Sequence, residues 1–263
     1  MMAEAPSAAH ARPFGPVERN SCGAGGHPRG SVRPMMLAED LLLLLTDDDT
    51  GKLAASGTEV DMALGGALLI ELALTGRVDV AGPDDRVREG RLVVRDPGPT
   101  GNGLLDEALA TVAQKEGKKP QSVVARLGKG ARVRLYERLA EGGILRAAEG
   151  RVLGIFPTHR WPAENTAHEA SVRAGIVTAL RNGTTTDPRT GGLISLLLAL
   201  SAVHKAVEPS SVGLSKREMN ANAKRIAEGD WAAKAVRAAI DSMSAAVIAA
   251  PSSATVLGGS SGS

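Results

Sequence analysis

The sequence is poor in aromatic residues and has a single cysteine. Two tryptophans, two phenylalanines and one tyrosine make up 2% of its 263 residues. The core must therefore consist mostly of Leu, Ala, Val and Ile, and packing rich in Leu and Ala favours α-helices over sheets. The lone Cys22 excludes an internal disulfide and fits a reducing compartment.

No uncharged apolar run is long enough for a transmembrane helix. The strongest runs, at 41–46, 62–70 and 191–203, are shorter than the roughly 18–20 residues that a bilayer requires. The N-terminus also lacks the apolar core of a signal peptide. We therefore expect a cytoplasmic protein that is soluble or lies on a membrane surface.

The chain has little excess charge. Its formal net charge is +2, and residues 1–34 account for it with four arginines against two glutamates. The remainder balances, so no long-range field draws it to nucleic acid or to an anionic membrane. Nucleic acid is not an expected partner, since no recognition motif is present, and any anion-binding site must be local.

Motifs for catalysis and metal binding are also missing. No pair of histidines has the spacing of HExxH, and no serine lies in a GxSxG context. Residues 47–51 resemble a calcium loop, but the glycine comes one position early and no glutamate follows at the required offset. The loop at 98–103 lacks the Gly-Lys-Ser/Thr of a phosphate loop. We predict a protein that is not an enzyme and has no metal or cofactor.

The strongest structural signal is the segment 67–78, ALLIELALTGRV. Its apolar side chains cover more than one face of a helix, which indicates a buried core helix that Gly76 ends. Glu71 is predicted to be a paired structural carboxylate rather than a catalytic acid or base, with Arg77 as one candidate partner, because an unpaired buried charge is costly. The fold class is therefore mainly α: a single globular domain with this helix ringed by amphipathic helices, plus short β-hairpins.

Composition divides the chain into three parts. Residues 1–34 are rich in Gly, Pro, Ala and Arg and are predicted to be a disordered extension. Residues 35–250 form the predicted domain, and residues 251–263 form a flexible Gly/Ser tail. Met35 and Met36 stand just before the first ordered residue, so one of them is a candidate for the true start in place of Met1.

Periodicity places other elements around the core helix. Helices are predicted at 37–46, 104–114, 121–127, 131–141, 167–181, 192–204, 215–228 and 231–249, and short strands at 78–80 and 91–94. A hairpin is predicted at 144–156 with its turn at Glu149-Gly150, followed by a loop at 157–162. The hairpin could be internal to the domain or a dimer contact. For Trp161 we favour packing against the hairpin over insertion into a membrane.

Six segments, in this order and spacing, resemble the Golgi phosphoprotein 3 family, which includes bacterial members. They are LAEDLLLLLTDDDTG (37–51), GALLIELALTGRV (66–78), LLDEAL (104–109), RLYERLAEGGIL (134–145), FPTHRWP (156–162) and LISLLLAL (193–200). The chain is identified as a bacterial member. The resemblance implies a mostly helical, non-enzymatic peripheral membrane adaptor that binds phosphatidylinositol 4-phosphate and the cytoplasmic tails of membrane proteins, with a hairpin used in self-association.

The resemblance also implies a lipid site. The family's tryptophan and first arginine fall on Ser56 and Gly65 here, so two groups are altered. Its other two arginines fall on Lys129 and Arg132, and a lysine keeps charge without the bidentate fork. We predict a weaker anionic-headgroup site at Lys129, Arg132 and Arg126. The alternative is a solvated helix start on a soluble helical protein-interaction module that binds no lipid.

Overall fold

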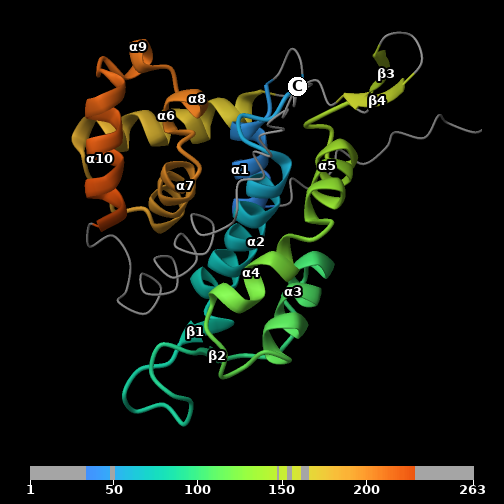
Figure 1. Cartoon of the computed structure of the whole chain (residues 1–263), viewed down its shortest axis with the longest axis vertical. Helices are drawn as coiled ribbons and strands as arrows, with labels where there is room; N and C mark the ends of the chain where they lie inside the picture. Colours follow the sequence, from blue (N-terminus) through green and yellow to red (C-terminus); the bar gives the residue numbers. More distant parts are fainter. Residues whose placement is uncertain (1–33, 48–50, 147, 153–155, 161–165, 229–263) are drawn as a thin grey trace, which may run out of the picture. The chain divides into compact units, whose positions relative to one another are not determined.

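The computed structural model describes residues 34–47, 51–146, 148–152, 156–160 and 166–228 (Figure 1). Its helices are α1 (Leu37–Leu45), α2 (Gly57–Leu74), α3 (Gly103–Ala113), α4 (Gln121–Gly128), α5 (Ala131–Glu141), α6 (Ala167–Asn182), α7 (Pro188–Ala199), α8 (Val203–Ala206), α9 (Pro209–Val212) and α10 (Lys216–Glu228). The mainly α fold class is confirmed. The predicted extension up to residue 33, the helix at 231–249, the tail and Trp161 lie outside the described residues.

Helix α2 is the core helix that the sequence predicts, but it begins ten residues earlier. Its apolar residues from Val60 to Ala73 are buried all round, with Met62 only partly so. Ser56 caps its start: the Ser56 hydroxyl accepts the Glu59 N–H, and Glu59 accepts the Ser56 N–H in return, which is the capping box. At the other end Gly76 takes a φ of +71°, the left-handed conformation that ends a helix.

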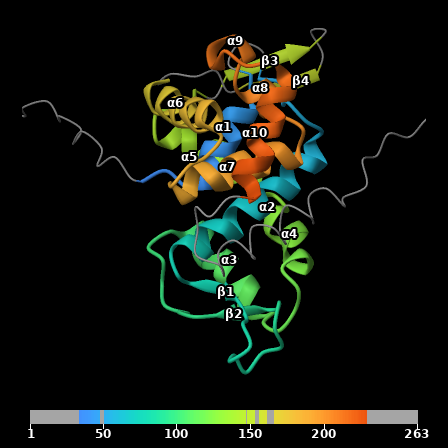
Figure 2. The same cartoon turned by 90° about the vertical axis from the view of Figure 1, so that its left-hand side faces the viewer.

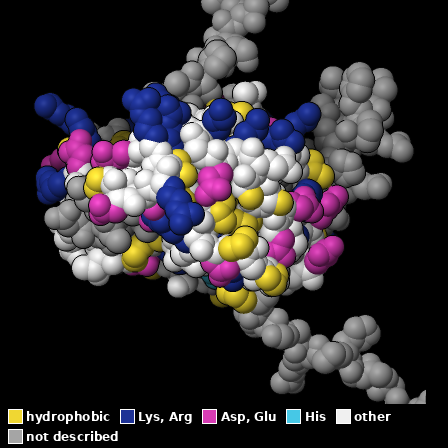
Figure 3. All heavy atoms as spheres, turned by 90° about the horizontal axis from the view of Figure 1, so that it is seen from below, with side chains coloured by type: hydrophobic (Ala, Val, Ile, Leu, Met, Phe, Trp, Pro, Cys, Tyr) yellow, Lys and Arg dark blue, Asp and Glu magenta, His cyan; other side chains and the backbone are white. Residues whose placement is uncertain are grey.

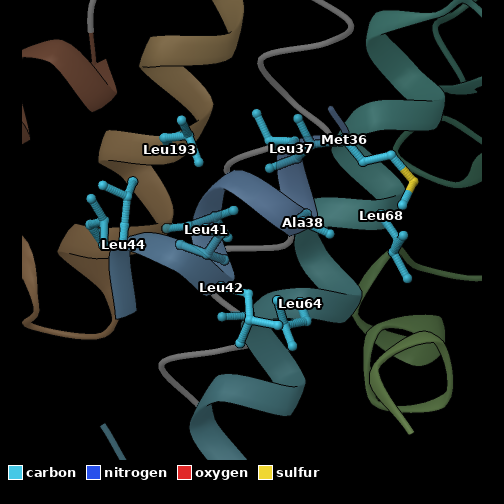
Figure 4. Packing of buried hydrophobic residues seen from close by; sticks show 14 of the residues in the cluster. Met36, Leu37, Ala38, Leu41, Leu42, Leu44, Leu64, Leu68 and Leu193 are labelled. Atoms are coloured by element: carbon cyan, nitrogen blue, oxygen red, sulfur yellow. The ribbon is translucent and has the colours of Figure 1, made fainter. Parts of the chain in front are cut away.

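Helix α1 packs across α2, and its nine residues are all buried. It contacts α2, α5, α6, α7 and α8. Figure 4 shows leucines of α1 between helices α2 and α7. Leu42 lies beside Leu64 of α2, and Leu41 and Leu44 lie toward Leu193 of α7. Figure 2 gives the view turned by 90°, in which α7 again lies beside α1, and α10 packs on α7. The core is aliphatic, as the shortage of aromatic residues requires.

Helices α2 and α4 touch through their backbones. A Cβ added to Gly65 would lie 2.1 Å from the Val124 carbonyl oxygen, and one added to Gly128 would lie 1.9 Å from the Asp61 carbonyl oxygen. Real Cβ atoms do not approach oxygen so closely, so each helix requires a glycine where it contacts the backbone of the other. This contact fixes α4 against the central helix.

The start of α1 is held by buried carboxylates. Glu39 accepts the Met36 N–H at 2.9 Å, and Glu71 of α2 accepts the Leu37 N–H at 2.6 Å. Both amides belong to the unpaired donors of a helix N-terminus, where the helix dipole favours negative charge. The carboxylates therefore complete the backbone hydrogen bonding of α1 inside the core.

Arg189 of α7 binds two buried acids, Glu71 and its neighbour Asp40 of α1. Its guanidinium binds Glu71 at 2.8 Å and Asp40 at 3.1 Å, and it also donates to the Met35 carbonyl at 2.9 Å. Glu71 is thus a paired structural carboxylate, as predicted. The predicted partner Arg77 is wrong: it follows the Gly76 turn, which directs it outward to Asp96 at 2.6 Å.

Two antiparallel ribbons complete the described fold. β1 (Val78–Val80) pairs with β2 (Leu92–Val94), as the sequence predicts, with Val78 opposite Val94. β3 (Ala148–Val152) pairs with β4 (Phe156–Arg160), with Val152 opposite Phe156. The predicted turn is wrong, because Glu149 and Gly150 lie inside β3 and the chain reverses between residues 152 and 156. Glu-Gly lacks the side-chain preference for positive φ that makes Asn-Gly and Asp-Gly strong hairpin signals.

Candidate anion-binding site

The break between α4 and α5 brings the predicted basic residues to one corner. Lys129 is the residue after α4, and Gly130 follows with a φ of +73°, a left-handed conformation that glycine adopts without steric cost. Helix α5 then begins at Ala131. The Gly-Lys-Gly sequence therefore makes a tight turn and sets Lys129 next to the first turn of α5.

The N-terminus of α5 has no side-chain cap. Gly130 offers no side chain to its amides, and its first turn contains no acidic residue. A helix N-terminus carries a partial positive charge and N–H donors that favour an anion. Helices α2 and α7, in contrast, start with Ser56 and Asp187, whose side chains accept these amides.

Arg126 and Lys129 share a shallow depression of about 80 Å³ between α2, α3, α4 and α5. Both residues are exposed. In the part of the chain that the structure describes, neither side chain has a hydrogen bond or an ion pair, whereas Arg134 on the rim binds both oxygens of Glu107. Two of the three predicted basic residues, Arg126 and Lys129, thus line the same depression without an ion pair to any described residue, so both could contact an anion.

Arg132 turns the other way, toward the start of α2. Its Nε lies 3.2 Å from Oδ1 of Asp61, and its guanidinium covers Gly57. Asp61 Oδ1 is buried without a hydrogen bond, and this burial raises the pKa of Asp61, an effect that Arg132 partly opposes. Arg132 is therefore held by a carboxylate of α2, whereas Arg126 and Lys129 line the depression beside α3.

Val133 was missed by the sequence analysis. It is 58% exposed, the one large exposed hydrophobic side chain among the described residues. It lies in the first turn of α5, off the buried stripe of Ala131, Leu135 and Leu139. Its place on the polar face of an amphipathic helix was the signal that could have found it. The corner thus offers an apolar contact as well as positive charge.

The two altered positions have structural roles. Ser56 caps α2, and its hydroxyl is 2.7 Å from the Glu59 carboxylate. Gly65 lies inside the α2–α4 contact, where no side chain fits. With this backbone packing an arginine cannot reach the surface from position 65. Of the four positions that the resemblance implies, only those of Lys129 and Arg132 carry a basic side chain.

A larger hollow of about 420 Å³ lies beside the α1 start. It is lined by Glu71, Arg138 and Arg189 among other residues. These charged groups are already in ion pairs with one another or with α1, because Arg189 binds Glu71 and Asp40, and Arg138 binds Glu39 at 3.3 Å. This hollow presents no free charge for a ligand. Within the described residues, no group of three His, Cys, Asp or Glu side chains could hold a metal ion.

A family model for Golgi phosphoprotein 3 (GPP34) matches residues 37–243. The chain belongs to the Golgi phosphoprotein 3 family. The predicted family is therefore confirmed, and the match includes every helix described here as well as the α4–α5 corner. No helix in the described part of this family member is long and apolar enough to cross a membrane.

A curated relative supports the same family. The vacuolar protein sorting-associated protein 74 of Eremothecium gossypii is 31% identical over 169 residues. The match covers 56% of this chain and 49% of that protein, so it spans about half the length of the relative.

Proposed function

We propose that this family member is a non-enzymatic, peripheral membrane adaptor that binds an anionic phospholipid headgroup at the α4–α5 corner. The observation that carries the proposal is the coincidence of four features there: exposed Arg126 and Lys129, the uncapped start of α5, and exposed Val133. Phosphatidylinositol 4-phosphate is the headgroup that family resemblance favours. The protein would act in the cytoplasm and on the membrane surface.

Binding is electrostatic docking with an apolar contact. A phosphate at the corner would accept hydrogen bonds from the first-turn amides of α5, while Lys129 and Arg126 neutralise its charge. Val133 would lie at the level of the headgroups. Each basic residue near an anionic surface contributes about 1 kcal/mol, so one corner gives weak attachment.

Self-association would strengthen this attachment through avidity. The β3–β4 hairpin, whose strands overlap the predicted 144–156 segment and extend into the predicted loop at 157–162, is the candidate contact between copies. As partners we propose cytoplasmic tails of membrane proteins, in keeping with a relative whose name refers to vacuolar protein sorting. Such a protein would hold cargo tails at the membrane without chemical change.

Replacing Arg126 and Lys129 with alanine is expected to weaken binding to anionic vesicles about 25-fold, since each charge is worth about fivefold near the membrane. The measurement is co-sedimentation of the full chain with phosphatidylcholine vesicles that contain phosphatidylserine or phosphatidylinositol 4-phosphate. Pure phosphatidylcholine vesicles report binding that does not depend on charge.

The matched control removes two exposed charges elsewhere, with Lys216→Ala and Arg217→Ala at the start of α10. This control is expected to bind like the unmodified chain. Equal weakening in both variants would point to net charge rather than to the corner. No binding to any vesicle would favour the alternative, a soluble helical protein-interaction module.

Asp61→Asn is expected to strengthen binding to anionic vesicles about fivefold, because it removes one negative charge beside the corner and releases Arg132. Burial raises the pKa of Asp61, so acidification protonates it earlier than an ordinary aspartate. Binding of the unmodified chain should therefore increase as pH falls, and Asp61→Asn should reduce this increase. A titration of vesicle binding against pH with both proteins tests the expectation, and an unchanged pH response in Asp61→Asn would contradict it.

A further inference from the structure

We propose that the membrane contact extends beyond the α4–α5 corner, along the exposed face of α4 to the loop of the β1–β2 ribbon, and that this strip binds an anionic bilayer surface rather than one headgroup. The inference rests on the proposed function and adds a second contact to it. The loop comprises residues 81–91, and the chain between α3 and α4 comprises residues 114–120.

The exposed face of α4 carries positive charge only. Its buried side is formed by Val123, Val124 and Leu127, and its exposed residues recur at helical spacing on the other side. The helix contains no acidic residue. Arg126 and Lys129 lie at one end of this face, and exposed Lys118 and Lys119 precede its other end, with the eight residues of α4 spanning about 12 Å at 1.5 Å per residue.

The ribbon joins this face directly. The Leu92 N–H donates to the Lys118 carbonyl at 2.8 Å, and the Gly117 N–H donates to the Leu92 carbonyl at 2.9 Å. The Val87 side chain would lie 3.8 Å from a Cβ placed on Gly117, so the loop packs on the same connection. Arg86 and Arg88 on this loop are exposed. The loop and α4 therefore form one continuous stretch of surface.

Most acids of this region are in ion pairs or accept hydrogen bonds, whereas most of its basic residues form no ion pair with the described residues. Arg95 holds Asp85 at 2.8 Å, and together with the Gly82 N–H it lowers the pKa of Asp85 to about 2. Other arginines hold Asp96 and Glu107, which leaves Asp84 and Glu89 as the acids at the loop without a partner. In the described part of the chain, eight basic side chains here have no ion pair: Arg86, Arg88, Arg91, Lys115, Lys118, Lys119, Arg126 and Lys129.

The pattern fits a bilayer better than nucleic acid. Figure 3 views the end of the molecule that carries the β1–β2 ribbon, and basic side chains gather along one edge of this face. Residues 82–129 contain no aromatic side chain on which a base could stack. Exposed Val133 lies in the first turn of α5, close in sequence to Lys129, and is an apolar group suited to the membrane interface. A row of charges that contacts many headgroups needs no fitted pocket, which agrees with serine and glycine at positions 56 and 65, where the resemblance would place a tryptophan and an arginine.

Replacing Arg86 and Arg88 with alanine tests the strip. We expect vesicle binding by the full chain to weaken about 25-fold at a fixed phosphatidylserine content, as much as in the Arg126→Ala/Lys129→Ala variant. The double variant Arg86→Lys/Arg88→Lys should bind like the unmodified chain, because the proposed contact depends on positive charge and not on the bidentate geometry of the guanidinium. Thermal unfolding confirms that each variant is folded, and the α10 pair described above controls for net charge.

The outcomes separate the two proposals. Undiminished binding of the Arg86/Arg88 alanine variant, with binding lost in the Arg126/Lys129 variant, overturns the strip and leaves the corner. Equal weakening in the alanine and lysine variants assigns the effect to loop structure and also overturns the strip. No binding of the unmodified chain to phosphatidylserine vesicles overturns the strip, and no binding to phosphatidylinositol 4-phosphate vesicles as well overturns both proposals. Tighter binding to a short RNA than to vesicles, lost in the same alanine variant, would replace the bilayer with nucleic acid.

Discussion

Replacing Gly65 with alanine is expected to lower the free energy of unfolding by about 3 kcal/mol, the upper end of the usual cost of overpacking. The added methyl group would lie 2.1 Å from the Val124 carbonyl oxygen and 2.7 Å from the Gly128 nitrogen. Both are backbone atoms, so no rotamer change can relieve the contact. Helices α2 and α4 must separate, which loosens the packing of buried Val124 and Leu127.

Urea unfolding followed by circular dichroism measures the loss. Gly103→Ala is the matched control, since Gly103 is the first residue of α3 and no atom would lie within 4 Å of its added Cβ. This control should be as stable as the unmodified chain or more stable by up to about 1 kcal/mol, because alanine restricts the unfolded chain. A Gly65→Ala protein as stable as the control would contradict the backbone contact between α2 and α4.

Arg189→Ala is expected to lower the free energy of unfolding by about 3 kcal/mol, at the lower end of the cost of breaking a buried ion pair because the arginine is 36% exposed. The change leaves Asp40 and Glu71 without their guanidinium, and both carboxylates are buried, with 4% and 7% of their surface exposed. It also removes a hydrogen bond to the Met35 carbonyl. The loss should appear as a lower denaturation midpoint with an unchanged slope.

Arg134→Ala provides the contrast. Arg134 also binds a carboxylate, that of Glu107, but the two side chains are 44% and 63% exposed. Water and salt screen such a pair, so its loss should cost less than about 1 kcal/mol. If the two arginine variants were destabilised equally, the cluster at the α1 start would not be a buried one in solution.

Much of this fold could be predicted from patterns near each residue. The apolar run around Glu71 predicted a buried helix, and Gly76 predicted where it ends. The start of α2 could also have been predicted, because Ser56 and Glu59 have capping-box spacing. Gly65 and Gly66 argued against one continuous helix from there to the apolar run. Glycine lowers helix propensity, and only the contact with α4 explains why position 65 requires it.

What could not be predicted depends on residues far apart in the chain. Glu71 binds Arg189, 118 positions away, rather than the nearby Arg77. The resemblance placed Arg132 in one site with Lys129, but Arg132 is paired with the carboxylate of Asp61, and Lys129 lies before the left-handed turn at Gly130 with no ion pair among the described residues. The sequence therefore predicted which side chains could form the candidate site, while the packing of α5 on α2 determined which of them share a surface.

The backbone contact between α2 and α4 also has a mechanical consequence. The α2 and α4 backbones are in direct contact at Gly65 and Gly128, with no side chain between them that could change its rotamer, so α4 is closely packed against the middle of the domain. If α4 rests on a bilayer while a cargo tail pulls on another surface, the tension passes directly into the core instead of being absorbed by a flexible joint. The domain would then tilt on the membrane as one stiff body.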